Sequence, residues 1–363
     1  MKENNHFLTR LLHLDMPLLV GLCLLAGVGL VVLYSAGGRD SDLVLRQIIR
    51  LTLGFAAMGM FAQIPPRHLD RVAPWLYVIG VILLAGVLFK GDIGKGARRW
   101  LDLGMIRFQP SEIIKVAMPV TIAWLLAGGI LPPRLGRLLL AAVMILLPVV
   151  LIAKQPDLGT ALLVGSSGIF TLFLSGISWW LMTILMTGLM ALAPVAWHFL
   201  HDYQRARVIM FLNPESDPLG AGYHIIQSKI ALGSGGVYGK GWLNGTQAHL
   251  DFIPERSTDF IFAVFGEEFG LMGAILLLIL YLFVIARGIY ITIQAQGTFS
   301  RLLAGSITLT FFVYVFVNLG MVSGLLPVVG VPLPLISYGG TSLVTLMAAF
   351  GILMSIAAHR RLV

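Results

Sequence analysis

The sequence has little charge and almost no cysteine. Only 12% of its 363 residues are Asp, Glu, Lys or Arg, and Cys23 is the single cysteine. One cysteine cannot form an internal disulfide, which excludes a scaffold held together by disulfides. The low charge content excludes a solvated, disordered chain. The few charged groups that are present therefore stand out.

Hydrophobic residues make up 58% of the chain, at a mean hydropathy of +0.90. This composition indicates an integral membrane protein. About ten apolar segments are long enough to cross ~30 Å of hydrocarbon as helices. They span residues 16–36, 43–63, 71–89, 110–128, 135–153, 157–174, 178–198, 258–286, 301–323 and 340–358. We predict an all-α polytopic membrane protein, with a single membrane domain over residues 1–363.

The charges of the short loops predict the orientation, because Lys and Arg concentrate on the cytoplasmic side. With a cytoplasmic N-terminus, the inner segments hold a consistent basic set: Lys2, Arg10, Arg67, Arg71, Arg134, Arg137, Arg287, Arg301, Arg360 and Arg361. Both termini are therefore predicted to be cytoplasmic.

Two loops on the predicted outer side, residues 90–109 and 199–257, are also rich in Lys and Arg. Long loops can cross the membrane regardless of charge, which is one explanation. The other is that these residues hold an anionic ligand near the outer headgroups. The loop 199–257, between the seventh and eighth segments, is much longer than an ordinary connector. Its amphipathic stretch, residues 222–241, predicts an ordered segment that covers a substrate.

Three segments that begin on the predicted outer side carry an acid at their start: Glu112, Asp157 and Asp259. An acid in the first turn complements the helix dipole, and proline suits the first helical position. The three acids could therefore simply complete helix ends. Converging helix N-termini also favour phosphate groups, so the alternative is a pyrophosphate site.

Glu112 is followed by Lys115, one turn farther into an apolar helix. An ion pair buried there is poorly explained by stability, because desolvation can cost more than the attraction returns. We expect the pair to shape a polar cavity.

Residues 251–270 contain the densest charged cluster of the chain, with Asp251, Glu255, Arg256, Asp259, Glu267 and Glu268. On a helix that begins at 258, the acids at 259, 267 and 268 point in different directions, so they cannot form one tight metal cluster. An isolated acid beside a phosphate site fits a general base. We predict that role for Asp259, and Glu255 and Arg256 as its neighbours in the site.

The segment 322–342 is rich in proline and glycine and then polar at Ser337, Tyr338 and Thr341. It cannot be a plain transmembrane helix. We expect a re-entrant or surface-lying loop that lines a cavity, because irregular backbone at membrane depth must find its hydrogen bonds there. A simple interfacial turn is the alternative.

Four stretches together resemble the SEDS family (shape, elongation, division and sporulation). They are RWLDLGMIRFQPSEIIKVA (99–117), KQPDLGTA (154–161), FIPERSTDFIFAVFGEEFG (252–270) and NLGMVSGLLPVVGVPLPLISYGGTS (318–342). The last of them resembles the elongation branch of the family more than the division branch. Ser257 departs from the pattern, where a histidine is expected.

The resemblance implies a peptidoglycan glycosyltransferase of the bacterial cytoplasmic (inner) membrane, which polymerises lipid II at the outer face during cell elongation. It places the catalytic aspartate at Asp259, as the base that deprotonates the acceptor sugar. Arg207 and Lys229 or Lys240 would neutralise the undecaprenyl pyrophosphate that leaves. A divalent cation could share this task, although the sequence shows no compact set of ligands.

The partners implied by the resemblance are lipid II, the growing undecaprenyl-linked glycan, a class B penicillin-binding protein and other elongation proteins. We expect no nucleic acid. A flippase or transporter for the same lipid remains an alternative, since it would also need an outward polar cavity. A scaffold protein is a third alternative.

Overall fold

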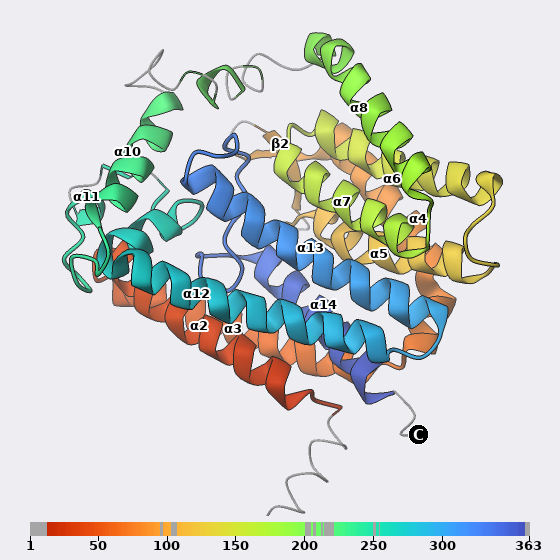
Figure 1. The fold of residues 1–363 in the computed structure, drawn as a ribbon, viewed down its shortest axis with the longest axis horizontal. Coiled ribbons are helices and arrows are strands. Elements are labelled where there is room, and N and C mark those ends of the chain that lie inside the picture. The colour runs from red at the N-terminus through yellow and green to blue at the C-terminus, as the bar shows by residue number, and fades with distance from the viewer. Residues whose placement is uncertain are drawn as a thin grey trace, which may run out of the picture.

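The computed structural model describes residues 13–94, 97–102, 107–199, 205, 208–211, 213, 221–249, 252–253 and 255–359. Long helices lie side by side in a bundle, and the shorter α10 (Ala221–Ser234) and α11 (Thr246–His249) lie at one end of it (Figure 1).

Each of the ten apolar segments forms a helix, which confirms the predicted polytopic fold. The helices are α2 (Met16–Ala36), α3 (Ser41–Ala62), α4 (Pro66–Lys90), α5 (Pro110–Ala127), α6 (Leu135–Lys154), α7 (Leu158–Leu174), α8 (Trp179–Phe199), α12 (Ile261–Gln294), α13 (Thr298–Val322) and α14 (Thr341–Ala358). Within the described part of the chain, eight of them have the length and composition to cross a membrane.

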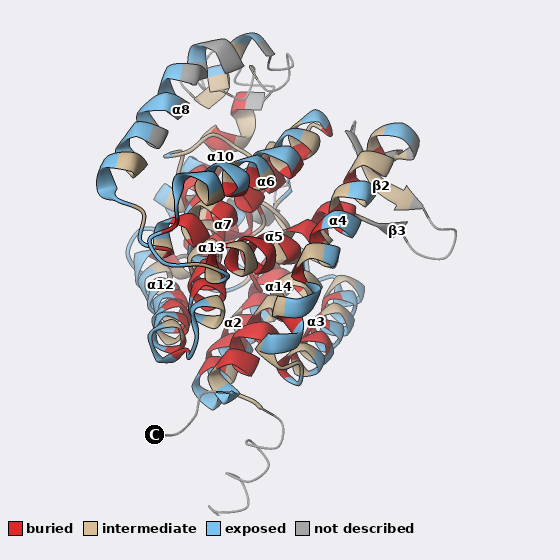
Figure 2. Cartoon of the chain, turned by 90° about the vertical axis from the view of Figure 1, so that its right-hand side faces the viewer, coloured by how far each residue is buried: buried red, intermediate tan, exposed pale blue. Residues whose placement is uncertain are grey.

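The buried residues gather where α5, α13 and α14 meet, whereas many residues of the outer helices are exposed (Figure 2). α13 packs against α5, α7, α12 and α14, so it lies at the centre of the bundle. On the outer helices, large residues such as Leu53, Leu139 and Leu276 are more than half exposed. Exposed leucines of this kind face hydrocarbon in a membrane protein.

A small antiparallel sheet is the first departure from the all-α prediction. It is made of β1 (Asp92–Gly94), β2 (Ala97–Asp102) and β3 (Arg107–Phe108), in the order β1-β2-β3. Trp100 pairs with Asp92, and Leu101 pairs with Phe108. Segments this short lack the length for a clear alternating pattern, which is why the sequence did not reveal them.

The start of α12 is the second departure. The prediction that a helix begins at residue 258 is wrong, because Phe260 is the N-cap and the helix begins at Ile261. Glu255 has a left-handed φ of 52°, and its carbonyl oxygen accepts hydrogen bonds from the N–H groups of Thr258 and Phe260. These bonds close two turns. Asp259 therefore belongs to a turn and not to the first helical turn, and the predicted angles between it and the later acids do not apply.

α12 is also longer than predicted and is interrupted at Gly270, whose φ is 63° and ψ −163°. The loop that follows α10 fills the interruption. Leu271 and Met272 donate their backbone N–H groups to Gly236 and Val237, at 3.0 Å each. A Cβ atom on Gly270 would lie 2.3 Å from the backbone nitrogen of Gly239. Glycine is therefore required at 270 both for its φ and for this close approach.

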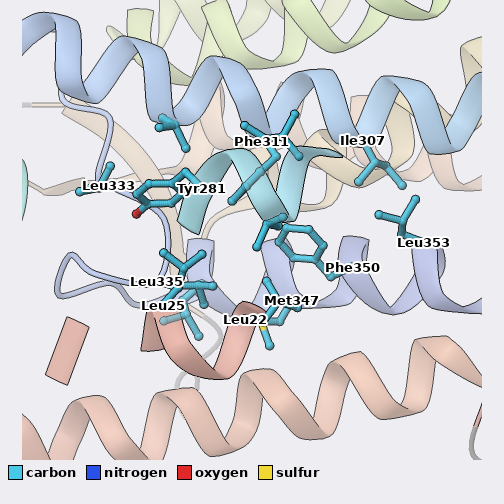
Figure 3. Close-up of a cluster of buried hydrophobic side chains, with 14 of the residues drawn as sticks. Leu22, Leu25, Tyr281, Ile307, Phe311, Leu333, Leu335, Met347, Phe350 and Leu353 are labelled. Atoms are coloured by element: carbon cyan, nitrogen blue, oxygen red, sulfur yellow. The ribbon is translucent and has the colours of Figure 1, made fainter. Parts of the chain in front are cut away.

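The non-helical segment between α13 and α14, residues 323–340, enters the protein core. Leu333 and Leu335 are nearly fully buried and lie near Tyr281 (Figure 3). The Tyr281 hydroxyl donates a 2.7 Å hydrogen bond to the carbonyl oxygen of Pro334. A Cβ atom on Gly29 of α2 would clash at 2.4 Å with the carbonyl oxygen of Leu335. The segment is thus buried against two helices, which excludes a simple surface turn.

Candidate active site

Asp259 lies in the turns just before α12 and is half-buried. Its carboxylate oxygen Oδ2 lies close to Gly330, since a Cβ atom added there would be 3.5 Å away. Gly330 has a φ of 75° and belongs to the buried segment 323–340. The predicted base is therefore next to the proline-rich segment, although the two are about seventy residues apart in sequence.

Three consecutive carbonyl groups at Asp259 accept hydrogen bonds from the C-terminal part of the chain. The Tyr338 N–H donates to Ser257 at 2.8 Å. The Ser337 hydroxyl donates to Thr258 at 2.6 Å, and the Asn318 amide donates to Asp259 at 3.0 Å. Carbonyl groups outside a helix need such partners when water is scarce. The backbone of the turn is therefore fixed along its length.

Glu255 and Arg256, predicted as neighbours of Asp259, lie in the same turns. Glu255 is exposed and its Oε2 atom accepts a 2.7 Å hydrogen bond from the Thr258 hydroxyl. Arg256 is half-buried, and its guanidinium lies close to Gly38 in the α2–α3 connection. The charged cluster therefore lies in the loops at this end of the bundle.

Ser337 also lines a cavity that the segment 323–340 forms with α13 and α14. Pro332, Pro334, Tyr314 and Leu346 form other parts of its wall. Thr341 is the first residue of α14, and its carbonyl oxygen accepts a hydrogen bond from Thr345. The predicted loop that lines a cavity is confirmed.

Arg50 and Gln47 of α3 hold the same segment from the other side. The Arg50 guanidinium lies 4.1 Å from the centre of the Tyr338 ring and donates a hydrogen bond to Gly339. Gln47 is buried and donates to the carbonyl oxygen of Ser337 at 3.2 Å. Tyr338 is thus fixed by a cation–π contact and by its backbone.

A second cavity shares Tyr314 and Leu346 with the first and extends to Lys115 on α5. The Lys115 ammonium lies 2.8 Å from Glu112 Oε1, and both side chains are nearly buried. The predicted ion pair therefore forms. Glu112 Oε2 is buried without a hydrogen-bond partner among the described residues. Lys115, neutralised by Glu112, gives this apolar cavity a polar end.

Asp157, the N-cap of α7, is joined to the small sheet. Its Oδ1 atom accepts a hydrogen bond from the Thr160 N–H, and its Oδ2 atom accepts one from Gln109. Arg99 of β2 lies 3.8 Å from the same Oδ2 and donates to the carbonyl oxygen of Pro156. Asp157 therefore completes a helix end and also ties the loop 91–109 to α7.

The three basic candidates have different surroundings. Arg207 lies outside the described residues. Lys229 is an exposed residue of α10, and its side chain crosses Gly324 at the end of α13. Lys240 forms a 2.7 Å ion pair with Glu267 of α12, so its charge already has a partner within the protein.

The Glu267 carboxylate is fully buried and fastens the loop after α10 to α12. Besides Lys240, its Oε1 atom accepts hydrogen bonds from the Thr246 hydroxyl and the Gln247 N–H, both at 3.0 Å. The neighbouring Glu268 is also buried and accepts a short hydrogen bond from Ser35 of α2. The two acids thus point to different partners and hold two different segments.

We expect Lys240→Ala to destabilise this attachment. The Glu267 carboxylate would lose its charged partner, and loss of a hydrogen bond to a buried charged group costs about 1–3 kcal/mol. Thermal unfolding and limited proteolysis of residues 235–247 would measure the effect. Lys154→Ala, at an exposed lysine of α6, is the matched control. Unchanged melting and unchanged proteolysis would show that the ion pair does not hold the loop.

No group of three or more His, Cys, Asp or Glu side chains converges within the described ranges. Asp259, Glu267 and Glu268 each have a separate environment. We assign no step of the reaction to a divalent cation.

The sequence missed Asn318 and Gln47 as residues of this site. Each is a buried amide within an apolar helix. A polar residue at such a position is costly in a membrane helix. This cost could have indicated from the sequence that the two amides have a specific role. It could not show which distant carbonyl groups the amides contact.

Comparison with known proteins places this arrangement in a family. The family model FTSW_RODA_SPOVE, described as cell cycle protein, matches residues 13–362. The chain is 56% identical over 351 residues to the peptidoglycan glycosyltransferase MrdB of Escherichia coli (strain K12), covering 96% of this chain and 95% of that protein. It is 37% identical to the probable peptidoglycan glycosyltransferase FtsW of Trichlorobacter lovleyi, covering 97% and 95%.

Solved structures agree. A structure described as a peptidoglycan synthase complex that coordinates polymerization and crosslinking contains a chain with a TM-score of 0.83 at 33% identity, covering 95% of this chain and 98% of that chain. The crystal structure of the rod shape determining protein RodA of Thermus thermophilus has a TM-score of 0.73 at 30% identity, covering 95% and 97%. The chain belongs to the FtsW/RodA/SpoVE family of polytopic membrane proteins, as its motifs predicted.

Proposed function

We propose that this chain, which is a peptidoglycan glycosyltransferase with a role in cell elongation, polymerises lipid II with Asp259 as its general base. The observation that carries the proposal is similarity over nearly the full length to relatives named for this activity. The site supports it. Asp259, whose backbone is held by hydrogen bonds, lies at one end of the helix bundle beside the cavity-lining segment 323–340.

In the proposed reaction the 4-hydroxyl of the acceptor sugar attacks the anomeric carbon of the donor. Asp259 takes the hydroxyl proton as the new C–O bond forms. The bond between the anomeric carbon and the pyrophosphate breaks, and its electron pair leaves with undecaprenyl pyrophosphate. A single displacement converts the α-linkage of the donor into a β-linkage. The proton then passes from Asp259 to solvent.

The buried ion pair and its cavity fit the lipid-bearing part of the substrate. Apart from Lys115, Thr310 and Thr345, the second cavity is lined mostly by apolar and aromatic side chains such as Phe311 and Leu163. Such a lining suits polyprenyl chains, and Lys115, which pairs with Glu112, lies at its polar end. Ser337 lines the neighbouring cavity and also contacts the turn of Asp259 through Thr258.

The leaving pyrophosphate requires basic groups. Arg207 and Lys229 remain the candidates, and Lys240 is the weaker one because Glu267 already neutralises it. Arg99 and Arg256 lie at the same end of the bundle.

Lys229→Ala is expected to raise the KM for lipid II several-fold with little change in thermal melting, because Lys229 is exposed. The effect should shrink as salt is added, since exposed charges are screened within ~10 Å at 0.1 M salt. Lys229→Arg keeps the charge and is the control. An unchanged KM at low salt in the alanine variant would remove Lys229 from the site.

A class B penicillin-binding protein is the proposed partner, with lipid II and the growing glycan as ligands and other elongation proteins alongside. The similar chain in a peptidoglycan synthase complex supports a crosslinking partner. We also propose that the protein lies in the bacterial cytoplasmic membrane, with both termini cytoplasmic and Asp259 outside. The basic residues of the short loops support this orientation.

Transport of lipid II is the second candidate function, because a cavity with a buried ion pair at one end would also suit a carrier. Incubation of the purified protein with labelled lipid II separates the two. A polymerase releases undecaprenyl pyrophosphate, whereas a carrier leaves lipid II intact.

A further inference from the structure

Asn318 is a fully buried amide near the end of α13. Its Nδ2 group donates two hydrogen bonds, at 3.0 Å to the carbonyl oxygen of Asp259 and at 2.7 Å to that of Val331. Its Oδ1 atom accepts no hydrogen bond from the described residues. The opposite orientation of the amide would place an oxygen against two carbonyl oxygens, so the two donated bonds fix the orientation.

The two carbonyl groups that Asn318 joins belong to the two segments that meet at the Asp259 carboxylate. One belongs to Asp259 itself. The other belongs to Val331, the residue after Gly330, and Gly330 lies against Asp259 Oδ2. A single side chain therefore sets both the backbone of the acid and the wall beside its carboxylate.

Ser337 forms a similar contact with the carbonyl group of Thr258, the residue before Asp259. Its hydroxyl donates to Thr258 at 2.6 Å and accepts a 2.8 Å bond from the Leu333 N–H. Because Phe260 is the N-cap of α12 and has no side-chain capping bond, the helix itself does not hold residues 257–259. Besides the two local bonds to the Glu255 carbonyl oxygen, the turn is held by donors from α13 and from the segment 323–340.

We propose that Asn318, assisted by Ser337, is a positioning residue that holds the Asp259 carboxylate at the acceptor sugar. The inference rests on the proposed function, in which Asp259 is the base. A displacement of about 1 Å in a catalytic group can cost a factor of ~10² in rate. Losing Asn318 should therefore lower kcat far more than it weakens substrate binding.

The test compares Asn318→Ala with Ser306→Ala in the full-length protein with its penicillin-binding partner. Ser306 is a matched control, since it is also fully buried on α13 and donates a 2.7 Å hydrogen bond to the carbonyl oxygen of Ser167. Both variants remove a buried hydrogen-bonding side chain from the same helix, with two donated bonds lost at Asn318 and one at Ser306, but only Asn318 contacts the turn of Asp259. Rates are measured with lipid II and divided by the number of protein molecules that bind fluorescent lipid II.

We expect Asn318→Ala to lower kcat about 10- to 100-fold, with KM changed less than threefold. Ser306→Ala should keep kcat within twofold of the wild type, even if its melting temperature falls as much as that of Asn318→Ala. If Asn318→Ala does not fold, Ser337→Ala tests the neighbouring bond, with a fall in kcat of several-fold expected. A wild-type kcat per binding-competent molecule in the variant that folds would overturn the inference.

Asp259→Asn, measured in the same series, separates this inference from the proposed function. A wild-type rate for Asp259→Asn would show that Asp259 is not the base. The proposed function of Asp259 would then fail, and Asn318 would have no catalytic group to position. An inactive Asp259→Asn together with a wild-type kcat for Asn318→Ala would overturn the positioning inference alone.

Discussion

Asp259→Asn is expected to abolish glycan polymerisation while the protein still folds and enters the membrane. Loss of a general base commonly costs about 10²–10⁴ in rate. The fold should survive, because the substitution keeps the carbonyl groups of residues 257–259, which accept hydrogen bonds from Tyr338, Ser337 and Asn318. Purified variant and wild type would be compared with labelled lipid II at equal amounts of partner.

Asp42→Asn is the matched control for this variant. Asp42 is an exposed acid in the first turn of α3, at the same end of the bundle. Removing its charge should change stability by no more than about 1 kcal/mol and leave the rate unchanged. Near-normal polymer from Asp259→Asn would contradict the catalytic assignment.

Glu112→Ala and Lys115→Ala should each destabilise the protein strongly. Removal of one partner leaves the other charge uncompensated among apolar side chains, and breaking a buried pair costs about 3–5 kcal/mol. The two side chains are only 6% and 12% exposed, so solvent screens them little. Both single variants should also lose polymerisation, and thermal unfolding with the polymerisation assay would measure the two effects. The charge-swapped double variant could regain the fold without regaining activity.

The ion pair between Arg287 and Asp15 provides the control. It joins α12 to the start of α2 at the opposite end of the bundle, at 2.7 Å, with side chains that are 21% and 7% exposed. Asp15→Asn should lower stability but leave kcat per folded molecule unchanged. Full activity and normal melting of Glu112→Ala and Lys115→Ala would show that their pair has no part in the site.

Much of the fold follows from one-dimensional patterns. Apolar runs predicted every long helix, and the proline-rich segment 322–342 predicted a cavity-lining loop. The Glu112–Lys115 pair could be found because residues three apart share one helix face. These features depend on neighbours in the sequence, which a single chain displays directly.

Apart from the small sheet, whose strands are too short to show a pattern, the missed features depend on contacts between distant segments. Gly270 interrupts α12 because residues 236 and 237 supply carbonyl groups to the broken helix. Asp259 lies in a turn and not in the predicted helix, and the backbone of this turn is held by Asn318, Ser337 and Tyr338. The partner of Lys240 proved to be Glu267, which no spacing rule connects to it. Such pairings appear only once the chain has folded.

The most direct test of the account is the product formed from labelled lipid II by the purified protein and its penicillin-binding partner. We predict glycan strands and released undecaprenyl pyrophosphate from the wild type, and neither from Asp259→Asn. Intact lipid II with wild-type protein, together with movement of the labelled lipid across vesicle membranes, would contradict the account and establish a transporter instead.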